Sequence, residues 1–448
     1  MEGQAGLRRT LSARDLIVYG LLFIGPLAPV GVFGVLDAKS AGAVGLVYVV
    51  ATIAMAFTAL SYAEMSRVVP KAGSVFAYAS AGLGPSAGFL AGWLVMLDYM
   101  LIPSVAYLFS GIALHALFPP IPAWAFTALA FTATTALNVS GVRLAARVGL
   151  VVLLAEIVVL GVFVVMAVAV LVTEGPVRSW SSPFTGVGGT TVGAVIGAVS
   201  VAVLSFLGFD AIASFAEETT GDSRQVGRAV LLCLGVAGAL FVLQTCLAGL
   251  LAPMSPAELA AAPAEQGTAF YDVTARSVAP WLADLMKVAK AVGPAFAAMT
   301  AVAAAGRLLY GMARDGGLPR ALSSVDAGSG TPRVALLSTG AVTLAVSVWA
   351  ASRPDGLDVL VSVVDIGALA AFTMLHASVI GYFRIRQGSR DLWRHLVMPV
   401  AGGLVAIWII VLAAPLAKLV GLAWLAAGII VLAVRRNGPA GRARSTGS

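Results

Sequence analysis

Charged residues are scarce in this chain. Only 11% of its 448 residues are Asp, Glu, Lys or Arg, whereas 60% are hydrophobic. A soluble protein of this length needs more charge to cover its surface, so the composition excludes that class and predicts an all-α polytopic membrane protein. The formal net charge of +7 comes from basic residues spread over many short loops, a distribution that argues against nucleic-acid binding.

Cysteine and histidine are also rare. Cys233 and Cys246 lie in one apolar segment, about 20 Å apart if that segment is helical, which excludes a disulfide between them. The three histidines are too scattered to suggest a metal site. The chain also lacks a phosphate loop, a zinc-ligand cluster and a hydrolase motif. The sequence therefore indicates no cofactor, no metal and no enzyme activity.

Long apolar segments dominate what remains. We predict about 12 membrane spans of the ~20 residues that a bilayer requires, with approximate cores at residues 15–36, 42–66, 86–114, 121–139, 147–172, 192–216, 228–251, 283–312, 334–351, 358–383, 395–413 and 416–434. If these spans alternate in direction, 20 of the 28 Lys and Arg residues fall on one side. Because cytoplasmic loops are enriched in Lys and Arg, both termini are predicted to be cytoplasmic.

Two of these segments carry an interruption near the middle. Residues 17–36 contain Gly25-Pro26 and Pro29-Val30-Gly31, and residues 193–218 contain a glycine at the centre of Ser205–Asp210. Unwound backbone in a membrane is tolerated only where it is buried in protein or lines a cavity. A matched pair of interrupted spans therefore predicts the binding site of a secondary transporter.

The spacing of the two interruptions predicts an internal repeat. The second interrupted span comes five spans after the first, and an odd number of spans per repeat inverts the second repeat relative to the first. We expect a cytoplasmic N-terminus at 1–14, a first repeat at 15–172, a second at 192–383, two further spans at 395–434, and a cytoplasmic tail at 435–448.

Several stretches resemble the amino acid–polyamine–organocation permeases. They are AEMSRVVPKAGSVFAYASAGLGPSAGFLAGWLVMLDYMLIP (63–103), SFLGFDAIASFAEETTGDSRQVGRAV (205–230), GRLLYGMARDGGLPRAL (306–322) and Thr331-Pro332. GPLAPVGVFG (25–34), WLVMLDYMLIP (93–103) and IGALAAFTMLHASVIGYF (366–383) look most like the putrescine-importer-like branch. The resemblance implies a leucine-transporter-type fold of two five-helix inverted repeats, with discontinuous helices 1 and 6. It also implies uptake or exchange of amino acids or amines.

The predicted substrate site consists of the two interruptions, that is Leu27, Ala28, Pro29, Val30 and Gly31 with Phe206, Leu207, Gly208, Phe209 and Asp210. Prolines leave backbone carbonyls without partners, and such carbonyls can hold an ammonium group. The family usually has a glycine-rich run at the first interruption. Here Pro29-Val30 stands in its place, which removes N–H donors and favours an amine. Asp210 either binds substrate or tethers the unwound segment by hydrogen bonds.

Other charged residues lie inside the predicted spans. Glu156 has no charged neighbour in sequence and is either the proton-coupling group or a protonated side chain bonded between helices. Asp98 and Asp365 either attract a cation or have a structural role. Lys287 and Lys290 share one face near the outer end of a span, where we expect snorkelling to the interface, or else a gating role. A sodium site is disfavoured, because only Thr300 offers a hydroxyl where sodium-coupled members of the fold have two.

These observations predict a secondary active transporter in the cytoplasmic membrane, with small-molecule substrate, protons and the lipid bilayer as its partners. It would take up a small amine or amino acid with protons by alternating access. The alternatives are an antiporter that exchanges substrate for product and a receptor that binds without transport.

Overall fold

The computed structural model describes residues 12–69, 74–140, 142–214, 219–220, 224–314, 316, 318–325, 332–413 and 415–437. The elements within them are helical and begin and end as follows: α1 (Ala13–Ile24), η1 (Ala28–Gly31), α2 (Phe33–Lys39), α3 (Val44–Val68), α4 (Ser74–Leu83), α5 (Pro85–Leu117), α6 (Ala123–Ser140), α7 (Val142–Thr173), α8 (Ser182–Thr185), α9 (Val192–Ala202), η2 (Val203–Phe206), α10 (Ala211–Ser214), α11 (Arg224–Leu251), α12 (Pro256–Ala261), η4 (Pro263–Glu265), α13 (Ala269–Ser277), α14 (Pro280–Arg314), η5 (Arg320–Ser323), α15 (Arg333–Ala351), α16 (Gly356–Val379), η6 (Ile380–Arg386), η7 (Trp393–Val397), α17 (Met398–Leu412) and α18 (Pro415–Asn437).

Ten of the helices in the described part of the chain are long and apolar enough to cross a membrane. These ten coincide with ten of the predicted spans, including the interrupted first one. The other two predicted spans form α6 and the short series α9, η2 and α10. The chain is therefore a multi-pass helical membrane protein, as the composition predicts.

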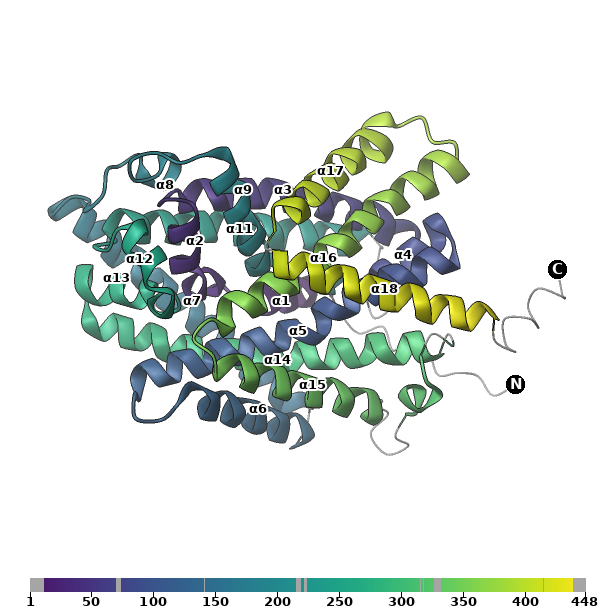
Figure 1. The fold of residues 1–448 in the computed structure, drawn as a ribbon, viewed down its shortest axis with the longest axis horizontal. Helices are drawn as coiled ribbons and strands as arrows, with labels where there is room; N and C mark the ends of the chain where they lie inside the picture. The colour runs from purple at the N-terminus through teal and green to yellow at the C-terminus, as the bar shows by residue number, and fades with distance from the viewer. Residues whose placement is uncertain are drawn as a thin grey trace.

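The long helices lie side by side along the longest axis of the molecule (Figure 1). α5 and α14 pack against each other over much of their length, and α5 also contacts α15, α16 and α4. α3 and α11 form a second closely packed pair. At Gly227 of α11 the backbone approaches Ala63 of α3 so closely that an added Cβ would lie 2.8 Å from the Ala63 Cβ. Small residues of this kind let membrane helices pack at short distance.

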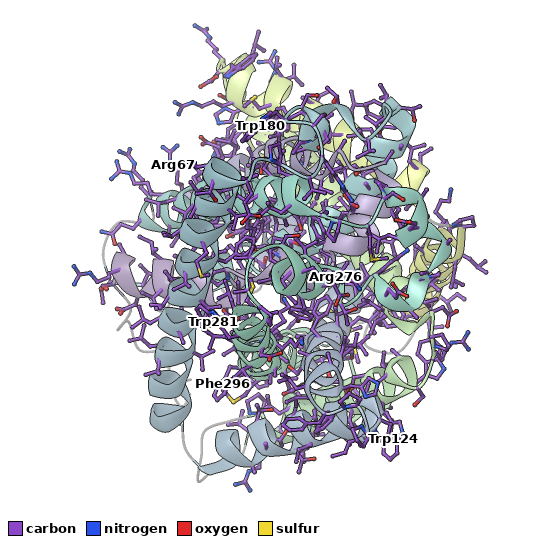
Figure 2. The ribbon with its side chains drawn as sticks, turned by 90° about the vertical axis from the view of Figure 1, so that its left-hand side faces the viewer. Arg67, Trp124, Trp180, Arg276, Trp281 and Phe296 are labelled. Atoms are coloured by element: carbon purple, nitrogen blue, oxygen red, sulfur yellow. The ribbon has the colours of Figure 1, made fainter. Side chains whose placement is uncertain are left out.

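The short helices α12 and α13 cover one end of the bundle (Figure 1). Figure 2 shows this end, with Arg276 of α13 facing the viewer and Trp124 and Trp180 towards the rim. The buried Arg178 guanidinium joins the segment between α7 and α8 to α2 through two hydrogen bonds of 2.7 and 2.9 Å to the Asp37 carboxylate. A bidentate pair of this type fixes geometry as well as charge, so it holds α2, the second half of the first interrupted span, in place.

Both predicted interruptions are present. In the first, α1 ends at Ile24 and the chain turns through η1 before α2 begins at Phe33. In the second, η2 ends at Phe206 and helix resumes at Ala211. The residues 1–11, the Ala216-Glu217-Glu218 element, Thr331 and the tail from 438 lie outside the described residues.

Candidate functional site: a cavity between two interrupted helices

The first interruption begins at a glycine. Gly25 has a φ of +73° and closes α1, with its N–H bonded to the Leu21 carbonyl at 2.9 Å. A residue with a side chain is strained at this φ, whereas glycine is not. Pro26 and Pro29 follow and donate no backbone hydrogen bonds. The chain therefore leaves the α-helical path at Gly25, and the backbone carbonyls that follow lack regular helical partners.

Two buried polar side chains from other helices supply partners for these carbonyls. Gln244 of α11 donates from Nε2 to the Pro26 carbonyl at 3.0 Å. Lys290 of α14 donates from Nζ to the Leu27 carbonyl at 2.9 Å and to the Ala28 carbonyl at 3.4 Å. The interruption therefore forms an ammonium-binding site, and in this structure the ammonium group in it belongs to the protein itself.

The second interruption also depends on a glycine. Gly208 has a φ of +110°, and an added Cβ would lie 3.0 Å from the Phe23 Cβ and 3.2 Å from the Phe23 carbonyl carbon. The unwound backbone of the second interrupted span is thus in direct contact with the last turn of α1 at this point. Only glycine combines this φ with so close an approach.

Asp210 holds the second interruption in shape. Its Oδ1 accepts a hydrogen bond from the Gly208 N–H at 3.2 Å, and its Oδ2 accepts one from the Tyr99 hydroxyl at 3.0 Å. The Asp210 side chain is fully buried. Of the two roles considered from the sequence, these contacts correspond to the tether, and Asp210 is not part of the cavity wall.

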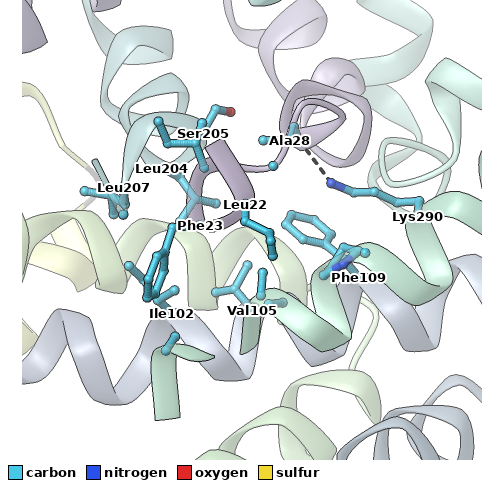
Figure 3. A pocket seen from close by; sticks show the side chains of 18 of the residues that line it. Leu22, Phe23, Ala28, Ile102, Val105, Phe109, Leu204, Ser205, Leu207 and Lys290 are labelled. Carbon is cyan, nitrogen blue, oxygen red and sulfur yellow. Dashed lines mark hydrogen bonds between the residues drawn. The ribbon is translucent and has the colours of Figure 1, made fainter. Parts of the chain in front are cut away.

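A cavity of about 100 Å³ lies between the two interruptions. Figure 3 shows Lys290 and Phe109 on one side of it, with Leu207, Phe23 and Ile102 on the other. One water needs roughly 10–15 Å³ of such space, so the volume suits a ligand of a few non-hydrogen atoms. The wall is largely apolar, with Lys290, Glu156, Tyr99 and Ser205 as its polar side chains.

Lys290 does not snorkel to the membrane interface, so the expectation from the sequence is wrong. The residue is only 3% exposed, and its ammonium points into the cavity, 4.8 Å from the centre of the Phe109 ring. An aromatic face stabilises a desolvated cation. Lys287, one turn away, instead pairs with the exposed Asp284 at 2.9 Å. The two lysines therefore have different environments although they share a helix face.

Glu156 of α7 is 6% exposed and lines the same cavity as Lys290. The two charges interact electrostatically. The Glu156 carboxylate lies against the backbone of Gly293, so a methyl group added at Gly293 would overlap the carboxylate. Gly293 is one turn beyond Lys290 on α14, so this helix presents both the cation and the space for the carboxylate.

The other predicted site residues have different surroundings. Phe206 packs against Tyr48 and Phe241, and Phe209 packs against Tyr62 and Phe372. Both phenylalanines are fully buried outside the cavity wall. From the first interruption, Ala28 lines the cavity and Leu27 contributes its carbonyl to Lys290, whereas Pro29, Val30 and Gly31 are buried behind this surface.

Asp98 and Asp365 are buried outside the cavity. Asp98 is fully buried and Asp365 is 3% exposed, and their carboxyl oxygens find no hydrogen-bond donor among the residues that the structure describes. The two carboxyl groups interact electrostatically with each other. Asp365 also lines a separate hollow that Lys39 and Ser200 border.

Several residues that contribute to the site were not predicted as site residues. Tyr99 and Phe109 of α5 lie in an almost uniformly apolar helix, and Gln244 is the single amide in α11 that reaches the first interruption. For Lys290, the sequence predicts a position at the membrane interface. A glutamine or lysine inside an apolar span is a usable signal, because a polar group at that depth needs a partner.

This arrangement defines a class of membrane protein. Two interrupted helices that meet at a small cavity lined by a lysine and a glutamate are an arrangement typical of secondary transporters. A family profile described as "Amino acid permease" matches residues 16–439. The chain belongs to this family of transporters, which are not enzymes.

Characterised relatives span nearly the same length. The chain is 30% identical to the low-affinity putrescine importer PlaP of Escherichia coli (strain K12), over 95% of this chain and 93% of PlaP. It is 29% identical to the branched-chain amino acid permease BcaP of Bacillus subtilis (strain 168), over 89% and 85% of the two chains. It is 28% identical to a methylthioribose transporter of the same organism, over 84% and 81%.

Proposed function

We propose that this protein is a proton-coupled importer of a small amine or amino acid, which binds in the cavity between the two interruptions. The observation that carries the proposal is the position of the Lys290 ammonium on the Leu27 and Ala28 carbonyls, inside a cavity that Glu156 also lines. These carbonyls bind an ammonium group, and a substrate amine presents the same chemistry. The names of the relatives, a putrescine importer and an amino acid permease, support this range of substrates.

The positive charge of Lys290 in the cavity favours an amino acid over a diamine as the substrate. A zwitterion can place its ammonium on the carbonyls that Lys290 vacates and its carboxylate on the displaced Lys290. A diamine has two positive charges and nothing to pair with Lys290. The cavity has one cation and one carboxylate, which is the charge complement of a zwitterion. In the sequence, Pro29-Val30 replaces the family's glycine-rich run and so favours an amine. Lys290 of α14 offsets this preference, because its ammonium can pair with a substrate carboxylate.

Proton coupling at Glu156 follows the same logic. When Glu156 is ionised, it attracts Lys290 and competes with the substrate carboxylate for it. When Glu156 is protonated, Lys290 is released for the substrate. A proton and a zwitterion therefore assist each other's binding, and linkage makes this effect reciprocal. A cationic amine would instead compete with the proton for Glu156, so an inward proton gradient would not drive its accumulation. Proton symport through Glu156 thus goes with an amino acid.

The remaining expectations belong to the same proposal. The 12-span arrangement with inverted repeats at 15–172 and 192–383, cytoplasmic termini and location in the cytoplasmic membrane are supported by the basic-residue asymmetry and the matched interruptions. Alternating access would move the two interrupted spans against the packed helices around α5 and α14.

One experiment separates the alternatives. Purified protein in proteoliposomes is given an inward proton gradient and radiolabelled leucine or putrescine. We expect accumulation of leucine that collapses when the gradient is removed, and loss of that accumulation in Glu156→Gln while leucine–leucine exchange persists. Uptake that ignores the gradient but requires internal substrate would establish the antiporter. Binding without flux of either compound would establish the receptor.

Lysine substitutions test the role of Lys290 with a matched control. Lys290→Met should abolish the thermal stabilisation by leucine, whereas Lys287→Met, on the same helix face, should retain it. If both variants keep full stabilisation by leucine, Lys290 does not bind the substrate carboxylate.

A further inference from the structure

The second half of the first interrupted span is enclosed at one end of the bundle. After η1, which borders the cavity through Ala28, the chain continues into α2, and α2 packs against the short helices α12 and α13. Phe33 contacts Phe270 of α13 with ring centres 5.5 Å apart, and a Cβ added at Gly34 would lie 2.8 Å from the Ala269 Cβ. α2 therefore lies between the cavity wall and the cover at this end.

One buried arginine holds α2 in this position. The Arg178 side chain is 7% exposed and the Asp37 side chain is fully buried. Besides its two bonds to Asp37, the Arg178 guanidinium donates to the Met254 carbonyl, in the connection that leads to α12. The Arg178 backbone N–H donates to the Leu250 carbonyl in the last turn of α11 at 3.1 Å. Arg178 thus joins α2 both to α11 and to the start of the cover.

A buried ion pair near the surface suits a contact that opens and closes. A charge left buried without its partner is costly, whereas charges that separate into water recover their hydration. Asp37 is two residues from the exposed Lys39, and Arg178 stands between the exposed Val177 and Ser179. A small displacement of α2 would therefore hydrate both charges, while the pair stays closed as long as water is excluded.

We propose that Arg178 and Asp37 form a latch that holds α2 beside the cavity, and that the cavity opens towards this end only when the latch separates. The proposal rests on the alternating access of the proposed function. The basic-residue asymmetry predicts that this end faces away from the cytoplasm, so the latch controls access of substrate during import. Because the ion pair is made in one state and lost in the other, removing either partner shifts the population towards the open state.

The test measures access to the cavity from the non-cytoplasmic side. A cysteine is placed at Ala106, which lines the cavity, and a membrane-impermeant methanethiosulfonate is added to cells that express the full chain. Mass spectrometry gives the labelling rate of each cysteine. We expect Asp37→Asn and Arg178→Gln to raise the rate at position 106 at least tenfold, the effect of losing a charged hydrogen bond. The control Arg276→Gln removes an exposed arginine of α13 at the same end (Figure 2) and should leave the rate unchanged.

The native Cys233 distinguishes opening of the cavity from unfolding. Cys233 is buried in α11 and its thiol donates to the Ile17 carbonyl, so it should stay unlabelled in every variant. Labelling of Cys233 together with position 106 would show general unfolding and would overturn the latch. An unchanged rate at position 106 in both latch variants would also overturn it, as would an equal increase in Arg276→Gln.

A second variant covers the case in which Arg178→Gln does not fold. Arg178→Lys keeps the charge but cannot form the bidentate pair, so it should raise the labelling rate less than the loss of charge in Asp37→Asn does. A rate equal to that of the parent would count against the latch.

The labelling needs neither substrate nor a proton gradient, so the two proposals can fail separately. If leucine is not accumulated but the latch variants are labelled faster, the proposed import fails and the latch stands as a gate of the cavity. If leucine is accumulated and the labelling rate does not change, only the latch fails.

Discussion

The Tyr99 hydroxyl donates a 3.0 Å hydrogen bond to Asp210, which ties α5 to the second interruption. Tyr99 also lines the cavity, whereas Asp210 stands behind it. This bond therefore connects the cavity wall to the unwound backbone around Gly208. A change at Tyr99 should alter both the stability of the interruption and the shape of the cavity.

Tyr99→Phe should lower the free energy of unfolding by about 1–3 kcal/mol, because a buried carboxylate loses a donor. It should also reduce uptake. Tyr107→Phe is the control. Tyr107 lies on the same helix but does not line the cavity, and its hydroxyl forms a hydrogen bond of 2.7 Å with the Thr134 hydroxyl. Both variants should unfold at lower temperature, and only Tyr99→Phe should reduce uptake per folded molecule. Equal uptake by both would separate the Asp210 tether from function.

Gly208→Ala should be strongly destabilising. The added methyl group would be forced against Phe23 at a backbone conformation that suits glycine, which costs about 1–3 kcal/mol for the backbone alone. Gly161→Ala in α7 is the control, because no atom lies within 4 Å of its added Cβ. We expect Gly161→Ala to be neutral or stabilising in a thermal melt. A mild effect at position 208 would mean that the second interruption and the last turn of α1 are not in firm contact.

Gly293→Ala tests the placement of Glu156 without changing a charged group. The methyl group would overlap the Glu156 carboxylate and push it out of its position beside α14. We expect the proton-driven accumulation of substrate to fall at least tenfold, while counter-substrate exchange continues. Wild-type accumulation by Gly293→Ala would show that Glu156 works from another position or not at all.

Asp98→Asn and Asp365→Asn should leave stability unchanged or raise it. Both carboxyl groups are buried without a hydrogen-bond donor among the described residues, and an unpartnered buried carboxyl costs free energy. Asparagine keeps the shape and removes the ionisable group. The measurement is the unfolding midpoint near neutral pH. A loss of several degrees would instead reveal that a cation or proton held there stabilises the protein.

The local chemistry of this sequence predicted the two interruptions well. Gly25-Pro26 and Gly208 act within one or two residues, through φ values and missing N–H donors that any structure containing them must respect. The sequence predicts a functional role for Glu156, because a carboxylate inside a long apolar helix is costly and rarely occurs without a function. Its position in the cavity wall agrees with that reasoning, although its role in coupling stays a prediction.

The same reasoning could not predict which side chains from other helices contact the two interruptions. Lys290 is 263 residues from Leu27 in sequence, and a lysine near the end of a span has the same local pattern whether it turns inward or snorkels outward. Phe206 and Phe209 share one short segment with Leu207, but only Leu207 lines the cavity. Which face of an unwound segment meets the cavity depends on Tyr48, Tyr62 and Phe372, whose positions come from other helices.

The contact between Lys290 and the Leu27 carbonyl also sets the scale of any affinity measured for this protein. A tethered group competes at an effective concentration fixed by its own chain, commonly in the millimolar range for a flexible tether. Dilution of the protein or its surroundings does not weaken such a competitor. The measured affinity therefore reports the difference in binding free energy between the ligand's ammonium and the Lys290 ammonium at the same carbonyls. A ligand can bind these carbonyls strongly while its apparent affinity remains modest.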